Sequence, residues 1–441
     1  MQSIQNSLEE LKKFLTALLL ILTTSTGYAI QEEQKIDLKG AIEVALQTNP
    51  QIKLSKLDID IARNNIFIAD RLQNPSIHTF QNIPKAGVGN PQQIGVDYTI
   101  EILKRGKRKE TAKTYSLAAI DSQKFLEYSL ITEVKKSYIN LLVKKSHLQI
   151  LKEQEALYEE LYKRMEEDVK QEKLPETEAI QAKIVLNRAI MYSNIARSEV
   201  ISAQNYFNSV MNTSNINYDT KEDTLPDDYA VLMTINPTDE SINFNDIKNY
   251  ALAHRYDLLA AKKEVQAAKN KLEAVKSQRI PDIELTGGYA YQTKGMSGDG
   301  HYQSGGYVGA SLVNIPLLYN YSPEIQNAQI EIEKAELKYK DIEIDAIRNL
   351  TDAWEKFVIA RNNLNFYNSE LLNNSEELMS ASRKSLQNSE IDLTTFLVSK
   401  KLYLELILGY QDTLGEYYTS FAELLKEINA DSINQIKIEN I

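Results

Sequence analysis

Glycine and proline are unevenly distributed along this chain, and that distribution constrains its fold more than any other feature. Of sixteen glycines, four lie at 87, 89, 95 and 106, and eight lie between Gly287 and Gly309. Six of the ten prolines fall in the same two windows, 75–106 and 281–323. Four long tracts contain neither residue: 107–174, 176–225, 238–280 and 324–408. Because glycine and proline interrupt regular structure most strongly, we expect long helices and two compact non-helical segments.

The two non-helical segments occupy equivalent places in two halves of the sequence. Several residues recur 206 positions later: Ala45 and Ala251, Leu46 and Leu252, Ala62 and Ala268, Asn64 and Asn270, Pro75 and Pro281, Ile77 and Ile283. Each half begins with a short helix and a longer helix, followed by proline, a glycine-rich segment and a long helix pair. An internal duplication is the simplest explanation.

Strict alternation of apolar and polar residues predicts strands in both glycine-rich segments. Apolar residues occupy every second position of 93–102, and the same period recurs around 283–292 and 308–312. This period is typical of strands with one apolar face. The candidate strand residues are Ile94, Val96, Tyr98, Ile100, Ile102, Tyr289, Tyr291, Val308, Ala310 and Leu312. Strands of about ten residues cross a bilayer when tilted, although two soluble hairpins packed on helices would give the same pattern.

The helical tracts are long enough to need partners along their whole length. The 68 residues from 107 to 174 would span on the order of 100 Å as one helix. Apolar residues between Tyr403 and Ile428 are spaced alternately by four and three, and Ile131 to Leu148 follow the same register with Lys145 interrupting it. This spacing indicates a coiled-coil seam, or equally the core of a helical bundle.

Composition and the N-terminal segment restrict the cellular location. Lys12 and Lys13 precede an apolar run, and a small-residue ending at Ala29 predicts a signal peptide over 1–29 with cleavage before Ile30. The chain has no cysteine, which excludes disulfides, a zinc-thiolate site and a thiol nucleophile. A net charge of −11 without a basic stripe argues against nucleic acid as a partner.

A membrane location would depend on the strands. No apolar run of about eighteen residues follows the signal segment. About eight strands is the practical minimum for a closed barrel, so four cannot form one. An open four-stranded sheet would leave unpaired backbone groups in lipid, so several copies would have to share one barrel.

Two further helix turns complete an ordered set of motifs. Arg164 precedes Leu174-Pro175 by ten residues, and Arg383 precedes Leu393 by the same distance. The second turn reads Asn-Ser-Glu-Ile-Asp-Leu-Thr-Thr-Phe-Leu over 388–397. Together with the duplicated Ala-Leu and Pro-x-Ile openings, these motifs resemble the TolC-like outer-membrane efflux protein family over essentially all of the mature sequence. The residues after the second strand, at 100–108, are similar to the cobalt-zinc-cadmium branch of that family.

The resemblance implies a mainly α fold with a small β part. Long antiparallel helical hairpins would form a periplasmic α-barrel, and four strands per chain would contribute to a trimeric, twelve-stranded outer-membrane β-barrel. The expected segments are the signal peptide 1–29, first-repeat helices 30–74, hairpin 75–105, long helix pair 106–213, polar equatorial segment 214–241, second-repeat helices 242–280, hairpin 281–318, long helix pair 319–429 and C-terminal tail 430–441.

The resemblance also implies a function and partners. The protein would be the passive exit duct of a tripartite efflux system in the outer membrane of a diderm bacterium, extending into the periplasm. It would form a homotrimer in outer-membrane lipid and work with a periplasmic adaptor and an inner-membrane pump, with an RND-type pump favoured. A duct for type I protein secretion and a periplasmic coiled-coil scaffold are the alternatives.

The candidate functional residues lie at the two helix turns. They are expected to form the periplasmic entrance and to dock the adaptor: Arg164, Glu166, Glu167, Asp168, Lys173, Leu174, Pro175, Arg383, Glu390, Asp392, Leu393 and Thr395. A salt link between the turns, with Arg383, Glu390 and Asp392 on one side, would hold the entrance shut. Family members often place aspartates just after the second turn, where this chain has Thr395 and Val398.

The sequence offers no catalytic or metal-binding constellation and predicts no cofactor. His78, His147, His254 and His301 are scattered and show no paired spacing typical of metal ligands. Asp299 beside His301 could bind a metal, but an exposed loop explains the pair more simply. We therefore expect a transport protein rather than an enzyme.

Overall fold

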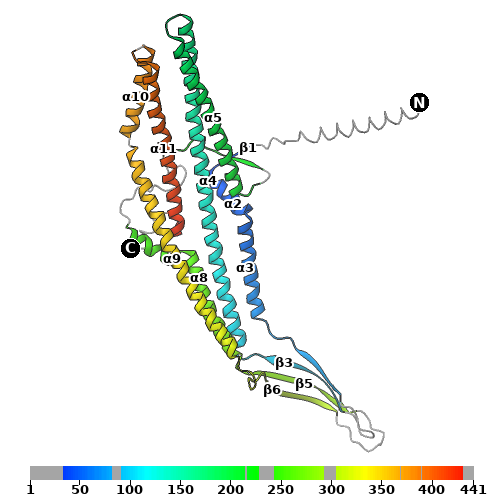
Figure 1. Cartoon of the computed structure of the whole chain (residues 1–441). Coiled ribbons are helices and arrows are strands. Elements are labelled where there is room, and N and C mark those ends of the chain that lie inside the picture. The colour runs from blue at the N-terminus through cyan, green and yellow to red at the C-terminus, as the bar shows by residue number, and fades with distance from the viewer. Residues whose placement is uncertain are drawn as a thin grey trace, which may run out of the picture. The chain divides into compact units, whose positions relative to one another are not determined.

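The computed structural model describes residues 33–81, 91–213, 216–227, 243–292, 304–367, 369–388 and 390–430. The predicted signal peptide, the turns at 86–90 and 295–300, the Asp299–His301 pair and the tail beyond 430 lie outside these residues. The chain is mainly helical, as predicted (Figure 1). It forms two compact units: Met1–Asn49, Glu133–Leu232 and Asn363–Thr419 make up unit 1, and Pro50–Thr132, Met233–Asn362 and Ser420–Ile441 make up unit 2.

Unit 2 contains a four-stranded antiparallel sheet. Its strands are β2 (Ser76–Gln81), β3 (Pro91–Ile100), β5 (Asp282–Gln292) and β6 (Gly305–Val313), in the order β2-β3-β5-β6 (Figure 1). The central pair β3–β5 joins the two halves of the duplicated sequence, and Val96 lies opposite Gly287 in its register. The sheet is therefore built jointly by both repeats.

One face of this sheet is apolar and exposed, and the other is polar. The apolar face carries Ile94, Val96, Tyr98 and Ile100 from β3, Tyr289 and Tyr291 from β5, and Val308, Ala310 and Leu312 from β6. Ile102 does not belong to it, because β3 ends at Ile100. Leu103 has a positive φ of 63°, and the Lys104 N–H donates to the Ile102 carbonyl as the chain turns into a helix. The prediction was wrong at this residue.

The polar face is organised around a row of two glycines. His78, Gly95, Gly288 and Tyr307 lie opposite one another across the four strands. The Tyr307 ring crosses both glycines, and its hydroxyl lies 2.7 Å from His78 Nε2. A Cβ atom at Gly288 would lie 2.6 Å from Gly95 Cα, so a larger residue cannot fit without displacing backbone. Asp97 Oδ2 lies 2.6 Å from His78 Nδ1 and completes the network.

The helices of unit 2 pack through small residues. They are α3 (Pro50–Ala69), α7 (Phe244–His254), α8 (Tyr256–Ser277), most of α9 (Ser322–Phe366), the first part of α4 (Lys104–Lys170) and the end of α11 (Leu393–Ile428). On α9 the buried residues follow a heptad: Ala346, Leu350, Ala353, Phe357 and Ala360. Phe357 meets Phe421 of α11 with ring centroids 5.4 Å apart. Alternating small and large residues let the helices approach closely along this seam.

Unit 1 contains α2 (Leu38–Thr48), the second part of α4, α5 (Glu176–Val210), α10 (Ser369–Gln387) and most of α11. It also holds a parallel strand pair that the sequence analysis did not predict, β1 (Glu33–Ile36) with β4 (Asn217–Thr220). Lys145, which interrupts the apolar register of α4, binds Asp219 of β4 at 2.7 Å. The interruption is therefore where α4 binds the strand pair.

The structure confirms the internal duplication. Both ends of α7 lie 206 residues after the corresponding ends of α2. The same offset separates the first residue of α8 from that of α3, and the first residue of β5 from that of β2. The N-caps correspond as well, because Asp37 accepts from the Gly40 N–H and Asn243 accepts from the Asn245 N–H. Side chains of this type satisfy the free N–H groups of a helix start. The repeat therefore extends to the signals that begin the helices.

The first long helix expected within the pair 319–429 is interrupted before the second helix turn. The region 324–408 lacks glycine and proline, yet α9 ends at Phe366 and α10 begins at Ser369. Among the helices that the structure describes, none is both long enough and apolar enough to cross a membrane.

Candidate functional site at the two helix turns

The first turn joins α4 to α5 and contains a residue in an unfavourable conformation. The Lys173 N–H donates to the Asp168 carbonyl and the Glu172 N–H to the Val169 carbonyl, both at 2.9 Å. This arrangement is a Schellman motif, in which glycine or asparagine usually takes the left-handed position. Here Glu172 takes it, with φ 57°. Pro175 then precedes the first residue of α5, where it prevents α4 from continuing.

The second turn joins α10 to α11 and is closed by its own acidic residues. Asp392 Oδ1 accepts from the Thr395 N–H at 2.9 Å and so caps α11. Hydrogen bonds from Thr395 hold the pKa of Asp392 below its ordinary value. Glu390 accepts from the Ser385 hydroxyl at 2.8 Å and from the Asn388 amide at 3.2 Å. Both carboxylates therefore stabilise the turn itself.

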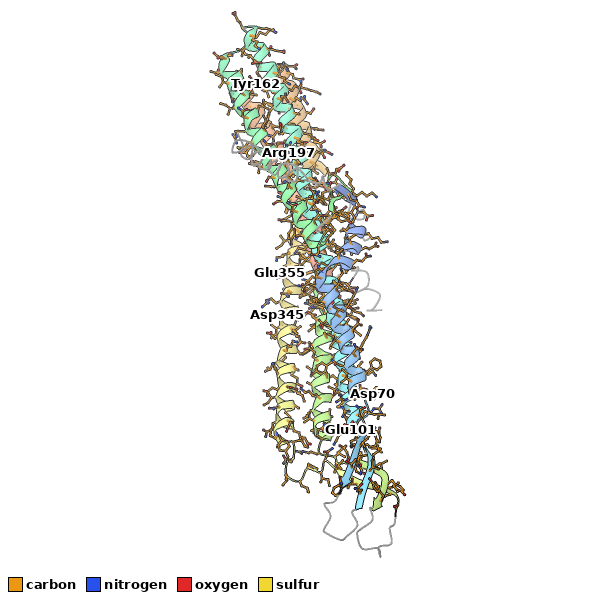
Figure 2. The ribbon with its side chains drawn as sticks, turned by 90° about the vertical axis from the view of Figure 1, so that its right-hand side faces the viewer. Asp70, Glu101, Tyr162, Arg197, Asp345 and Glu355 are labelled. Atoms are coloured by element: carbon orange, nitrogen blue, oxygen red, sulfur yellow. The ribbon has the colours of Figure 1, made fainter. Side chains whose placement is uncertain are left out.

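A shared apolar core lies beneath the two turns. Tyr158, Leu161 and Met165 of α4, Ala182 and Ala189 of α5, Leu386 of α10, and Leu393 and Phe396 of α11 form it. Leu174 packs against this core from the first turn, and so does Tyr162, which Figure 2 labels. The turns thus rest on one core to which four helices contribute. The predicted residues Leu174 and Leu393 are packing residues.

Next to this core, a cavity of about 310 Å³ separates the two turns. Its apolar wall consists of Leu161, Met165, Leu174, Leu386, Ile391 and Leu393. Its charged residues are Arg164, Asp168, Glu178, Glu390 and Asp392. Four carboxylates against one guanidinium make the cavity negative at neutral pH. It would therefore attract cations more than anions.

Few polar contacts cross from one hairpin to the other. Arg164 Nη2 donates to the Gln387 carbonyl at 2.9 Å, and Arg383 Nη2 lies 3.0 Å from Glu160 Oε2. Arg383 thus pairs with Glu160, which lies within α4 and is not among the predicted residues. Within the described residues, Glu390 and Asp392 make no ion pair with the first hairpin. Their part in the predicted link was wrong, because both carboxylates bind groups of their own turn.

The other predicted residues of the first turn make weak local contacts. Asp168 lies 3.9 Å from both Arg164 and Lys173, and Glu166 lies 3.4 Å from Lys170. Glu167 is exposed on α4. Exposed pairs of this kind each contribute little, about 0–1 kcal/mol. The tips therefore carry many charges without being held rigidly by them.

Lys400 is a buried cation just below the second turn that sequence reasoning missed. Its ammonium lies 4.9 Å from the centre of the Tyr403 ring. Within the described part of the chain it has no ion-pair partner, and desolvation lowers its pKa. The sequence signal for this burial was spacing: Lys400 follows Phe396 by four residues, which places both on one helix face, and Phe396 is fully buried. Thr395 and Val398, at the aspartate positions of the family, are exposed.

The histidines that the structure describes are dispersed. His78 belongs to the sheet network, His147 lies 3.2 Å from Asp412, and His254 Nδ1 donates to the Tyr250 carbonyl of its own helix. The described residues contain no cluster of three or more histidine, aspartate or glutamate side chains suited to a metal ion.

Comparison with known proteins identifies the architecture. The family model for the outer membrane efflux protein matches residues 248–392, about a third of the chain. Over this segment the chain is similar to the outer membrane efflux protein family, which supports the resemblance predicted from the sequence. An outer-membrane location stays a prediction that this similarity supports. No curated protein matches the sequence.

Solved structures share this fold over almost the whole chain. CusC superposes with a TM-score of 0.69 at 15% identity, covering 90% of this chain and 94% of its own. The Campylobacter jejuni channel CmeC gives 0.65 at 14% identity, with 91% and 88% covered. The open Neisseria gonorrhoeae channel MtrE gives 0.64 at 15% identity, with 89% of each chain covered. These three channels therefore resemble the chain about equally in fold.

Proposed function

We propose that this protein is the exit duct of a tripartite efflux system, which conducts substrates passively from an inner-membrane pump across the periplasm and outer membrane. The observation that carries the proposal is the sheet. It presents one continuous apolar face to solvent, and in the described chain β2 and β6 each pair on one side only. Lipid would cover the apolar face, but unpaired strand edges are prohibitive there. Three copies joined edge to edge would supply twelve strands and close the wall.

The helix turns are the proposed entrance and the docking site for the adaptor. Both turns rest on one apolar core, but among the described residues the direct polar ties near them are two exposed hydrogen bonds, from Arg164 to Gln387 and from Gln181 to Thr394, and the exposed Arg383–Glu160 ion pair. An element held this weakly can take two arrangements that differ by little free energy. Adaptor contacts would then bias the tips toward an open state. The negative cavity between the turns favours cationic substrates, and energy would come from the pump.

The type of inner-membrane pump is less well supported than the duct itself. The cobalt-zinc-cadmium branch and an RND-type pump stay predictions, because CusC, CmeC and MtrE superpose with similar TM-scores.

Fractionation and electrical recording test the proposal. The protein should be extracted from the outer membrane only with detergent, and should migrate as a trimer before boiling and as a monomer afterwards. In planar bilayers it should conduct. A protein that stays monomeric in buffer without detergent would overturn the duct.

The entrance can be tested with the same preparation. Since the chain has no cysteine, Glu160→Cys with Arg383→Cys introduces a unique pair that a short bismaleimide can join. We expect the joined channel to keep a low conductance and the unjoined pair to conduct more. Equal conductance of the two forms would contradict the assignment of the turns to the entrance, but it would not contradict the proposed duct.

A further inference from the structure

The segment between β6 and α9 exposes large apolar side chains. It reads Ile-Pro-Leu-Leu-Tyr over 315–319, and Leu317 is 83% exposed while Leu318 is fully exposed. Burying a leucine side chain is worth about 1.5–3 kcal/mol relative to leaving it in water. Two adjacent leucines in water on a short connection therefore need an explanation.

This segment is held in place by its neighbours on both sides. At its start, the Leu317 N–H donates to the Ile315 carbonyl at 2.8 Å around Pro316, which fixes a tight turn. At its end, Arg279 Nε donates to the Asn320 carbonyl at 2.7 Å. A flexible loop could fold its leucines back onto the protein. In segment 315–319, hydrogen bonds at both ends hold the backbone in a conformation that leaves the two leucines exposed.

Tyrosines fix the end of the segment nearest α9. The Tyr319 hydroxyl lies 2.8 Å from both carboxylate oxygens of Glu324, and the Tyr319 and Tyr321 rings meet edge to face at 5.4 Å. Tyrosine is enriched where a membrane meets water, because its ring is apolar and its hydroxyl is polar. Exposed leucines followed directly by oriented tyrosines have that composition.

Along the chain, the exposed leucines follow soon after the apolar residues of β6. On β6, Val308 is 92% exposed and Leu312 is also exposed, and Leu317 and Leu318 follow within six residues of Leu312. At the other corner of the sheet, where β3 meets α4, Leu103 is exposed too. The apolar surface therefore extends past the last residue of the strands.

Positive charge lies beside the segment. Asp282 binds both Asn314 at 3.0 Å and Lys104 at 2.7 Å, so the start of α4 lies next to the start of the segment. The first turns of α4 carry five basic residues, Lys104, Arg105, Lys107, Arg108 and Lys109. Lys104 is buried against Asp282, and Asp70 and Glu101 pair with Arg105, Lys109 and Arg108, so five cations face three carboxylates and a small positive excess remains. Basic side chains next to an apolar surface complement the phosphate groups of phospholipids.

We propose that residues 315–319 form an interfacial wedge that inserts into the periplasmic leaflet of the outer membrane, with phospholipid as its partner. The wedge would fix how deeply the sheet sits, because Leu317 and Leu318 lie among acyl chains while Tyr319 and Tyr321 lie at the headgroups. The proposal rests on the proposed function, since it needs the neighbouring sheet to face lipid.

Single cysteines test the wedge in the full-length protein. Leu318→Cys would be labelled with an environment-sensitive fluorophore and reconstituted in vesicles of phosphatidylethanolamine and phosphatidylglycerol, with or without brominated acyl chains. Val308→Cys on the apolar face is the lipid-exposed reference. Leu337→Cys, exposed on α9, is the control away from lipid. We expect bromine to quench positions 318 and 308 about twofold and position 337 negligibly.

The outcomes separate the wedge from the duct. Quenching at 308 without quenching at 318 overturns the wedge and leaves the proposed function standing. Quenching at neither position contradicts both. A second copy of the chain is the competing occupant: an unquenched, blue-shifted fluorophore at 318, with crosslinking of Leu318→Cys to another subunit, would assign the segment to the trimer contact and overturn the wedge.

Discussion

The corner where strands become helices and the pair of helix turns both depend on ion pairs, but the two regions place them in different surroundings. At the corner, Lys104 and Asp282 lie 2.7 Å apart with side chains only 3% and 2% exposed. At the turns, Arg383 and Glu160 lie 3.0 Å apart with side chains 47% and 66% exposed. The chemistry is the same, and burial differs by more than tenfold. The free-energy cost of breaking each ion pair depends mainly on that difference in burial.

Burial decides what each region can do. Removing one partner of a buried pair leaves an unpaired charge in the interior, whereas an exposed partner is replaced by water. The corner adds further pairs around the same point: Asp70, labelled in Figure 2, binds Arg105 at 2.8 Å and Lys109 at 2.9 Å. We infer that the corner holds one geometry, while the turns can exchange between two. A duct with a fixed wall and a movable entrance requires this combination.

Removing the buried cation should have the largest effect. We expect Lys104→Met to lower the free energy of unfolding by about 3–5 kcal/mol, because Asp282 stays buried without its partner. Unfolding of the detergent-solubilised protein, followed by circular dichroism, measures it. Adding Asp282→Leu should recover most of the loss, since it removes the orphaned charge. A change below about 1 kcal/mol in the single variant would show that the corner is as weakly held as the turns.

A second effect at the sheet should be smaller. Gly288→Ala places a Cβ against Gly95 Cα and the Tyr307 hydroxyl, so we expect a loss of roughly 1–3 kcal/mol from overpacking. Gly309→Ala on β6 is the matched control, because no atom lies within 4 Å of its added Cβ. Thermal unfolding of both variants gives the comparison. Equal stability of the two would mean that the glycine row does not restrict the sheet.

The sequence was sufficient for features that depend on local periodicity. Alternation at period two placed β3, β5 and β6 and their apolar face, and recurring residues located the repeat. It failed where a distant contact decides the outcome. The alternation continues through Ile102, but the chain leaves the sheet there, and Lys104 reaches a buried carboxylate 178 residues away.

The candidate site shows the same limit. Proline marked the first turn as a local signal, and the second turn was located through the resemblance of 388–397 to the family's second helix turn. The partner of Arg383 depends on how α10 and α4 are rotated against each other, which the spacing does not specify. The burial of Lys400 depends on the same packing. The left-handed residue of the first turn was missed because it is Glu172, whereas glycine or asparagine usually marks such a position in a sequence.

Lys400 offers a third test, in which the turn region should become more stable. Its pKa is lowered by desolvation, so the folded state binds its proton less tightly than the unfolded state does. The free energy that the buried charge of Lys400 subtracts from stability is therefore largest below its pKa in the folded state. It decreases as pH rises from that pKa toward the ordinary lysine pKa. We expect Lys400→Met to raise the free energy of unfolding by about 0.5–2 kcal/mol at neutral pH, with a smaller gain in alkaline buffer. Chemical denaturation across pH measures this. A destabilised variant would show that the Tyr403 contact outweighs desolvation.

The smallest effect on stability should come from the exposed pair, and it is the one that matters most for the entrance. A double-mutant cycle of Arg383→Ala and Glu160→Ala should give a coupling free energy of about 0.2–1 kcal/mol that decreases with added salt. The same variants should raise the open fraction in planar bilayers, because a coupling of about 1 kcal/mol changes a two-state ratio roughly fivefold. Lys401→Ala, whose partner Glu405 lies on its own helix, removes an exposed charge without touching the tie between hairpins. If that control opens the channel as much as Arg383→Ala, net charge rather than the cross-hairpin tie controls the entrance.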